Sequence, residues 1–282
     1  MTRPTPAAVV RGVPSTLARC ELTHIDRAPI DVDRAHHEHA TYVRALRDAG
    51  LTVIELPADE AHPDCVFIED VLLDVGGVRV LTRPGAASRR GERAAVADAF
   101  ASGGPLSAWG PLLEMPEGLT LDGGDVLAVR DQVFVGLSSR TDAEAARWLA
   151  GQLGRPVVPV DVDAALHLKT AVTALSEHVL ILDPDRLDPS PFRSFDVVLV
   201  APDESAAANC LRLPPRPERV GPTCRDERVL MPAGCPTTAA AVRRWGVDVI
   251  EVALPELSRA EAGLTCLSVL LAVEWTPAEE LR

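Results

Sequence analysis

Lysine is nearly absent from the sequence, and long apolar runs are absent altogether. Lys169 is the only lysine among the 282 residues. No run approaches the ~18 apolar residues that a membrane-spanning helix needs, and the first residues lack the long apolar core of a signal peptide. We therefore expect a cytoplasmic protein without a membrane partner.

The spacings typical of metal or redox cysteines are also missing. The six cysteines are scattered, and none forms a Cys-x-x-Cys pair. A zinc-binding or redox motif is therefore not expected, and reduced thiols are the default in the cytoplasm. The cluster His36-His-Glu-His39 offers two imidazoles that could share a helix face, but no third ligand is evident. We expect no metal there.

Basic residues are fewer than acidic residues, with 28 Lys and Arg against 41 Asp and Glu. The formal net charge of −13 argues against nucleic acid and anionic membranes as partners. Hydrophobic residues make up 47% and charged residues 24% of the chain, which is ordinary for a globular protein. The acidic balance favours cationic ligands, although acidic surfaces mostly serve solubility.

Short β-branched runs that end at a proline or another breaker recur about every 40–60 residues. The runs are residues 53–57, 111–116, 157–161, 197–202 and 249–255. Helical patterns precede four of them, at residues 36–49, 89–101, 141–153 and 237–245, and a shorter segment, 189–195, precedes the fourth run. One such unit cannot bury its own hydrophobic face. The sequence contains no Gly/Ser-rich linker. We therefore expect one domain over residues 1–282, built as a closed, pseudo-symmetric α/β array.

Polar residues gather in the segments that follow these runs. Asp64, Glu69 and Asp70 share the segment Asp-Cys-Val-Phe-Ile-Glu-Asp with strand-forming residues. On a solvated strand they would form a polar edge. If they point inward, they must meet a cation or become protonated, because an unpaired buried charge is costly.

The next two segments carry a carboxylate and an imidazole. Asp122 precedes Gly123-Gly124, which is either a hairpin turn or a place where the backbone approaches another group closely. His167 and Lys169 alternate with leucines at the period of a strand, so we expect both to point to one face. His167 is either a hydrogen-bonded histidine at the core edge or a proton shuttle.

One thiol and two arginines complete the candidates. Cys266 lies near the start of the apolar run 262–273, just after Gly263, where a strand could present it at the mouth of a site. The alternative is a buried core cysteine. Arg89 and Arg140 lie at the starts of expected elements. Arginine grips carboxylates through two parallel hydrogen bonds, but a surface salt bridge is the alternative for each.

Taken together, these segments resemble the dimethylarginine dimethylaminohydrolases, which belong to the guanidine-modifying superfamily with the pentein fold. The matching pieces are residues 64–70, 82–92, 121–126, 166–170, 208–210, 231–234 and 263–266. The resemblance implies a five-bladed ββαβ propeller around a central funnel, in agreement with the five units found from the runs.

The resemblance also implies roles for individual residues. Cys266 would be the nucleophile, His167 the general acid and base, and Asp122 the carboxylate that orients them. The remaining positions would contact the substrate: Asp64 and Asp70 at the guanidinium with Glu69 beside them, Arg89 and Arg140 at the α-carboxylate, and Leu22, on a mobile lid, with the backbone near Ala260 at the α-amino end.

The implied reaction is hydrolysis of an Nω-methylated arginine, dimethyl or monomethyl, to citrulline and dimethylamine or methylamine through a thiouronium on Cys266. It needs no metal or organic cofactor, although Zn²⁺ bound by Cys266 and His167 would inhibit it. The partner is a small guanidino amino acid, and a homodimer is left open. Alternatives are an arginine deiminase, an amidinotransferase and a non-catalytic pentein binding module.

Overall fold

Five three-stranded sheets make up the part of the chain that the computed structural model describes, residues 6–216 and 226–271. In order they are β15-β1-β2, β3-β4-β5, β6-β7-β8, β11-β10-β9 and β12-β13-β14. The strands span β1 Ala7–Arg11, β2 Thr52–Leu56, β3 Leu72–Val75, β4 Val78–Leu81, β5 Leu112–Glu114, β6 Val126–Val129, β7 Gln132–Leu137, β8 Val158–Asp161, β9 Val172–Ala174, β10 Val179–Leu182, β11 Asp196–Leu199, β12 Leu211–Leu213, β13 Arg228–Pro232, β14 Asp248–Val252 and β15 Ser268–Leu271.

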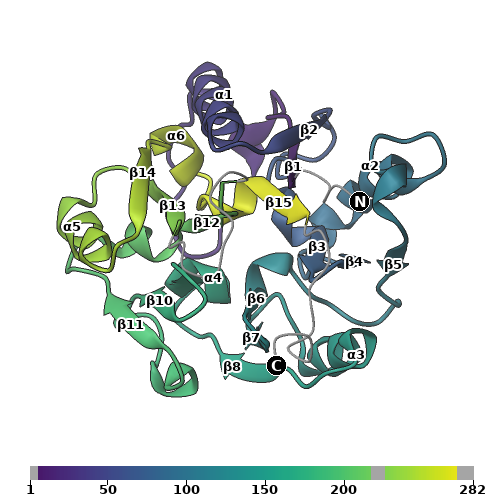
Figure 1. The fold of residues 1–282 in the computed structure, drawn as a ribbon. Coiled ribbons are helices and arrows are strands. Elements are labelled where there is room, and N and C mark those ends of the chain that lie inside the picture. Colours follow the sequence, from purple (N-terminus) through teal and green to yellow (C-terminus); the bar gives the residue numbers. More distant parts are fainter. Residues whose placement is uncertain (1–5, 217–225, 272–282) are drawn as a thin grey trace.

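The sheets repeat one topology. In each, the middle strand pairs antiparallel with one neighbour and parallel with the other, as β1 does with β15 and β2. A parallel pair needs a crossover connection. Four crossovers contain a helix, namely α1 Val32–Asp48, α2 Arg93–Phe100, α3 Ala143–Leu153 and α5 Pro236–Arg244. Figure 1 shows these helices on the outside of a ring of sheets.

The predicted five-unit array is therefore confirmed. Each of the five β-branched runs coincides with the outer strand of one sheet, and the short segment of the fourth unit forms only a 3₁₀ helix, Ser190–Phe192. The first sheet joins both ends of the described chain, because β1 pairs with β15. The interpretation of residues 1–282 as one domain stays a prediction.

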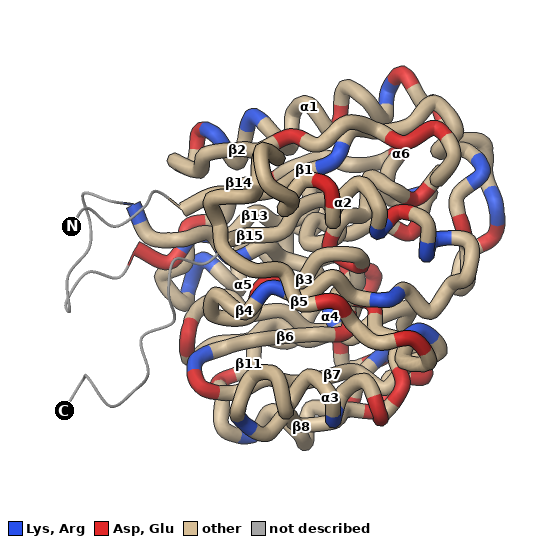
Figure 2. The backbone as a smooth tube through the Cα atoms, turned by 90° about the vertical axis from the view of Figure 1, so that its right-hand side faces the viewer, with Lys and Arg blue, Asp and Glu red and all other residues tan. Residues whose placement is uncertain are grey.

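Burial explains why the middle strands lie inside. All five residues of β1 and all four of β10 are buried, whereas in β2 only the last residue is buried. Five clusters of buried apolar side chains fill the space between sheets and helices. Figure 2 shows the charged residues mainly on helices and loops, while strands such as β6 and β7 carry none.

The structure corrects one local prediction and decides between the two alternatives for Gly123-Gly124. Residues 168–171 form a short helix, α4 Leu168–Ala171, instead of the expected strand. The hairpin turn lies at Arg130 and Asp131 between β6 and β7, not at Gly123-Gly124, which opens a 3₁₀ turn. A Cβ on Gly123 would lie 2.0 Å from the Glu69 carbonyl oxygen, so this turn needs glycine for a close approach.

A further helix, α6 Pro255–Ser258, precedes the turn that carries Cys266. Across residues 6–216 and 226–271, every helix falls short of the length and apolar character needed to cross a membrane.

Candidate active site

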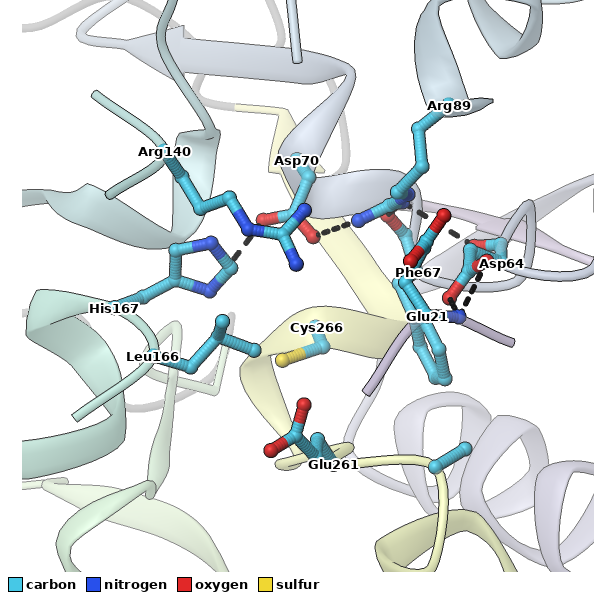
Figure 3. A pocket seen from close by; sticks show the side chains of 11 residues that line it. Glu21, Asp64, Phe67, Asp70, Arg89, Arg140, Leu166, His167, Glu261 and Cys266 are labelled. Atoms are coloured by element: carbon cyan, nitrogen blue, oxygen red, sulfur yellow. Dashed lines mark hydrogen bonds and ion pairs between the residues drawn. The ribbon is translucent and has the colours of Figure 1, made fainter. Parts of the chain in front are cut away.

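Several of the predicted site residues meet in one pocket. Its lining comprises Glu21, Asp64, Phe67, Asp70, Arg89, Arg140, Leu166, His167, Ala260, Glu261 and Cys266. In Figure 3 the sulfur of Cys266 points toward the side of the pocket where His167 and Leu166 lie. A shared cavity for the thiol and the imidazole is the minimum that a Cys/His mechanism requires.

Asp122 fixes the orientation of His167. The backbone of His167 is extended and immediately precedes α4, and its Nε2 lies 2.9 Å from Oδ2 of the fully buried Asp122. The other oxygen of Asp122 accepts a hydrogen bond from the Gly85 N–H at 2.8 Å. The carboxylate is thus held at both oxygens. The other ring nitrogen of His167, Nδ1, faces Asp70 and lies 3.9 Å from its Oδ1.

His167 is cationic at neutral pH. Burial by itself would lower its pKa, but the charge of Asp70, the hydrogen bond to Asp122 and the charge of Asp125 raise the pKa to about 9. The imidazolium is therefore ready to act as an acid.

Asp125 is a supporting residue for which no role was predicted, although it belongs to the segment 121–126. It is fully buried, and its carboxylate accepts hydrogen bonds from Ser138 Oγ, Thr141 Oγ1 and the Leu168 N–H at 2.6–2.9 Å. The last bond anchors α4 directly after His167. Between the two aspartates, a Cβ on Gly124 would lie 2.7 Å from Nδ1 of His167. Gly124 therefore makes room for the imidazole.

Cys266 is a neutral thiol at neutral pH. It lies in the 3₁₀ turn Thr265–Leu267 ahead of β15, and it is partly exposed. Its sulfur accepts a hydrogen bond from the Gly263 N–H at 3.4 Å. Burial, together with the charges of Glu69 and Asp70, raises the pKa of Cys266 to about 12. A bound cation is needed to bring that pKa down.

The reactivity of Cys266 should consequently depend on the charge of its reaction partner. We expect neutral 2-chloroacetamide to alkylate Cys266 slowly at neutral pH, with a rate that rises about tenfold per pH unit. The alkylation rate with cationic 2-chloroacetamidine should rise with the same slope but over a lower pH range, because the charge of this reagent stabilises the thiolate. Mass spectrometry of the peptide that contains Cys266 measures both rates, with free cysteine as the control. Identical pH profiles for the two reagents would contradict this account.

Two of the three predicted carboxylates line the pocket. Arg89 Nη1 is 2.5 Å from Asp70 Oδ2, and the Gly124 N–H donates to Oδ1 at 3.1 Å. Burial works against the charged form of Asp70, but the charges of His167 and Arg89 lower its pKa. Asp64 accepts the Glu21 N–H, and burial raises its pKa. Both carboxylates are buried, and Asp70 pairs with the Arg89 guanidinium, so the alternative of a solvated polar edge is wrong.

Glu69 does not line the pocket. Its carboxylate lies 2.5 Å from Lys169 Nζ and accepts a hydrogen bond from Thr265 Oγ1 at 2.7 Å. The expectation that Glu69 lies beside the aspartates at the substrate stays a prediction, and the contacts of its carboxylate are with Lys169 and with the turn that carries Cys266. The expectation that His167 and Lys169 share one face is wrong, because α4 replaces the strand.

The two arginines differ in their surroundings. Arg89 is 5% exposed and donates to Asp70, Glu92 and the carbonyl oxygens of Asp64 and Phe67, so a surface salt bridge is wrong for it. Its guanidinium is already bound by carboxylates, which raises its pKa. Arg140 is half-buried and donates from Nη2 to Thr23 Oγ1 at 2.8 Å. Of the two, Arg140 is better placed to receive a carboxylate.

The segment predicted to form a lid is tied to the pocket by a residue that the sequence did not single out as functional. The Glu261 carboxylate accepts the N–H groups of Thr23 and His24 at 2.7 and 2.6 Å. Ala260 lines the pocket as expected, but Leu22 packs against a hydrophobic cluster and Glu21 takes the pocket position. Glu21, Phe67, Leu166 and Glu261 had no chemical signal in the sequence beyond their places beside recognised motifs.

One group of potential metal ligands emerges among the described residues. Ligand atoms of Asp70, Asp122 and His167 lie within 4.8 Å of one another. Inhibition by zinc on Cys266 and His167 stays a prediction. His39, from the histidine-rich segment, is packed in α1, and burial lowers its pKa to about 4.

Comparisons with known proteins agree with the geometry. The model of the family "N,N dimethylarginine dimethylhydrolase, eukaryotic" matches residues 25–195. A dimethylarginine dimethylaminohydrolase of Streptomyces coelicolor is 37% identical over 273 residues, which cover 95% of this chain and 98% of that protein. One of Pseudomonas aeruginosa is 33% identical, covering 85% of this chain and 89% of its own length.

Solved structures give the same result. A mutant of the Pseudomonas aeruginosa enzyme complexed with citrulline superposes with a TM-score of 0.82 at 31% identity, covering 94% of this chain and 99% of that one. The N-terminal domain of a cyanobacterial arginine dihydrolase, at 18% identity, shares the fold with a TM-score of 0.81 over 95% of this chain and 98% of its own. Together with the five sheets, these matches confirm the predicted pentein propeller. The chain belongs to the dimethylarginine dimethylaminohydrolase family.

Proposed function

We propose that the protein hydrolyses Nω-methylated L-arginine, dimethyl or monomethyl, to citrulline and dimethylamine or methylamine. The observation that carries the proposal is the pairing, in one pocket, of a thiol with an imidazole that a buried aspartate holds. The relatives that bear the name of this activity cover most of the chain, which supports the same assignment.

The pocket offers the charges that a guanidino amino acid needs. Asp64 and Asp70 line it beside the sulfur and can hold the guanidinium in a fixed plane. Arg140 can pair with the α-carboxylate, and Arg89 keeps Asp70 ionised and in place. The bound guanidinium also lowers the pKa of Cys266, so the thiol loses its proton to solvent when the substrate arrives.

Covalent catalysis follows from these protonation states. The thiolate of Cys266 attacks the guanidinium carbon, and a sulfur–carbon bond forms. His167 gives its proton to the departing nitrogen, the carbon–nitrogen bond breaks, and dimethylamine leaves. The neutral imidazole then takes a proton from water, whose oxygen attacks the thiouronium carbon. The carbon–sulfur bond breaks and the thiolate returns, and citrulline is released after the hydroxyl that came from water loses its proton to solvent.

We further propose that the reaction uses no metal or organic cofactor, because the named side chains, the substrate and water supply every proton donor and acceptor in the steps above. Zinc bound to the thiol and imidazole would block both. A cytoplasmic location and a homodimer stay predictions.

A substrate panel tests the function. We expect purified protein to release equimolar citrulline and dimethylamine from asymmetric dimethylarginine, and methylamine from the monomethyl form. Agmatine, which lacks the α-carboxylate that Arg140 would bind, should be a poor substrate. Colorimetric citrulline detection and chromatography of the amine measure the products. Turnover of unmethylated arginine alone would instead indicate a deiminase, and transfer of the amidino group to an added amine would indicate an amidinotransferase.

A further inference from the structure

A closed set of hydrogen bonds adjoins the turn that carries Cys266. Lys169 Nζ lies 2.5 Å from Glu69 Oε1, and Thr265 Oγ1 donates to Glu69 Oε2 at 2.7 Å. Asn209 Nδ2 donates to the Lys169 carbonyl oxygen at 2.8 Å and to Thr265 Oγ1 at 3.2 Å. The Thr265 N–H returns a bond to Asn209 Oδ1 at 2.9 Å. We call these four residues the anchor ring.

The anchor ring is buried and draws on distant parts of the chain. Glu69, Asn209 and Thr265 are 7%, 5% and 4% exposed, and the Lys169 side chain is 12% exposed. The four residues lie between positions 69 and 265 in different sheets or their connections. None of them lines the pocket among the described residues. Their contacts are therefore with the nucleophile's turn and not with the space for a substrate.

The ring holds the chain at two points just ahead of the sulfur. At the first point, Thr265 immediately precedes Cys266 and makes three of the ring's hydrogen bonds. At the second point, Gly263 packs so closely on Asn209 that a Cβ there would lie 2.4 Å from the Asn209 Cγ. The N–H of the same Gly263 donates to the Cys266 sulfur. Asn209 thus holds the two residues that determine where the sulfur lies.

The ring also carries a charge pair near the sulfur. The charge of Glu69 raises the pKa of Cys266, after burial, whereas the charge of Lys169 lowers it. The carboxylate and the ammonium therefore act on the sulfur with opposite signs. Removing the charge of either residue should therefore change the electrostatic potential at the thiol.

We propose that Glu69, Lys169, Asn209 and Thr265 are positioning residues for the nucleophile. They hold the Thr265–Leu267 turn so that the sulfur faces the pocket, and the Lys169–Glu69 pair sets the electrostatic potential at the sulfur. Where turnover is concerned, this inference rests on the proposed function. The alkylation of Cys266 tests it without any substrate.

The first experiment compares two threonines. Thr265→Val removes the hydroxyl that joins Glu69 to Asn209, and we expect kcat on asymmetric dimethylarginine to fall about ten- to hundredfold while KM changes little. Thr238→Val is the matched control. Thr238 lies on the outer helix α5 and is 1% exposed, and its hydroxyl accepts a hydrogen bond from the Ala201 N–H. The control should lose comparable thermal stability and keep its kcat. Equal kcat values for the two variants would overturn the positioning role.

The second experiment reads the charge pair through the alkylation of Cys266 by 2-chloroacetamide. The thiolate displaces chloride, a sulfur–carbon bond forms, and the proton has gone to solvent. Glu69→Gln leaves the ammonium unbalanced and should move the rate profile to lower pH, whereas Lys169→Met should move it to higher pH. Lys169→Arg keeps the charge and should restore the wild-type profile. Shifts in the same direction for Glu69→Gln and Lys169→Met, or no shift, would refute the electrostatic role.

These measurements separate the inference from the proposed function. If the wild-type protein turns over no methylarginine, the proposed function fails, and the alkylation profiles still decide whether the ring acts on the sulfur. If Thr265→Val does not fold, two other variants take its place. Thr265→Ser keeps the hydroxyl and should retain most of kcat. Asn209→Asp introduces a negative charge that repels the Glu69 carboxylate, and its kcat should fall. Full kcat in Asn209→Asp would overturn the positioning role.

Discussion

Cys266→Ser should lower the turnover of asymmetric dimethylarginine by about 10⁴-fold or more. A serine hydroxyl ionises far less readily than a thiol, and the pocket already raises the pKa of the thiol to about 12 through burial and the charges of Glu69 and Asp70. A bound guanidinium brings a thiol into range but not an alcohol. Substrate affinity should persist, because the carboxylates that line the pocket are unchanged. Citrulline release and calorimetric titration measure the two effects.

The control for this variant is another cysteine. Cys235→Ser alters a buried thiol at the N-terminus of α5, away from the pocket lining, where serine is a favourable cap. It should retain wild-type turnover. A Cys266→Ser protein with substantial activity would mean that a different group attacks the substrate, and the mechanism would have to be abandoned.

His167→Ala should be the next most damaging change, with a fall in turnover of about 10³-fold or more, because one imidazole serves both half-reactions. Its effect should depend on the leaving group. S-methyl-L-thiocitrulline expels a thiolate that needs little help from an acid, so the first half-reaction should proceed and the second should stall. The variant should then accumulate a covalent adduct on Cys266, visible in the intact mass.

The matching control is His178→Ala, since His178 lies outside the pocket and its Nδ1 pairs with Arg130. That variant should neither lose turnover nor trap an adduct. Failure of His167→Ala to accumulate the adduct, together with rapid hydrolysis of S-methyl-L-thiocitrulline, would show that another base activates the water.

The catalytic residues were predictable because each lies in a segment with its own signal. Cys266 follows a glycine turn, Asp122 precedes Gly123-Gly124, and His167 stands among leucines. The sequence order of these segments matched a family, and the tertiary structure brings the cysteine and the histidine to one pocket, with Asp122 bonded to the histidine. Their chemical roles remain to be tested by the variants above.

Local conformation was less predictable where the runs are short. Residues 166–171 alternate polar and apolar side chains, a pattern that favours a strand but also fits one helical turn. The Asp125 carboxylate decides the matter, because it accepts the N–H at the start of α4 from a position 43 residues away in the chain. A hydrogen bond between residues so far apart in the sequence cannot be predicted from the local pattern.

The five-unit array follows from the amino-acid sequence alone, because each unit has an apolar strand that only its neighbours can cover. The contacts of the charged side chains, by contrast, are set by the folded arrangement of the sheets. Glu69 pairs with Lys169 beside the turn that carries Cys266, Arg89 is enclosed by carboxylates, and Glu261 holds the N–H groups of residues 23 and 24. A buried charge must find a partner, and the ring of sheets supplies partners from far along the chain.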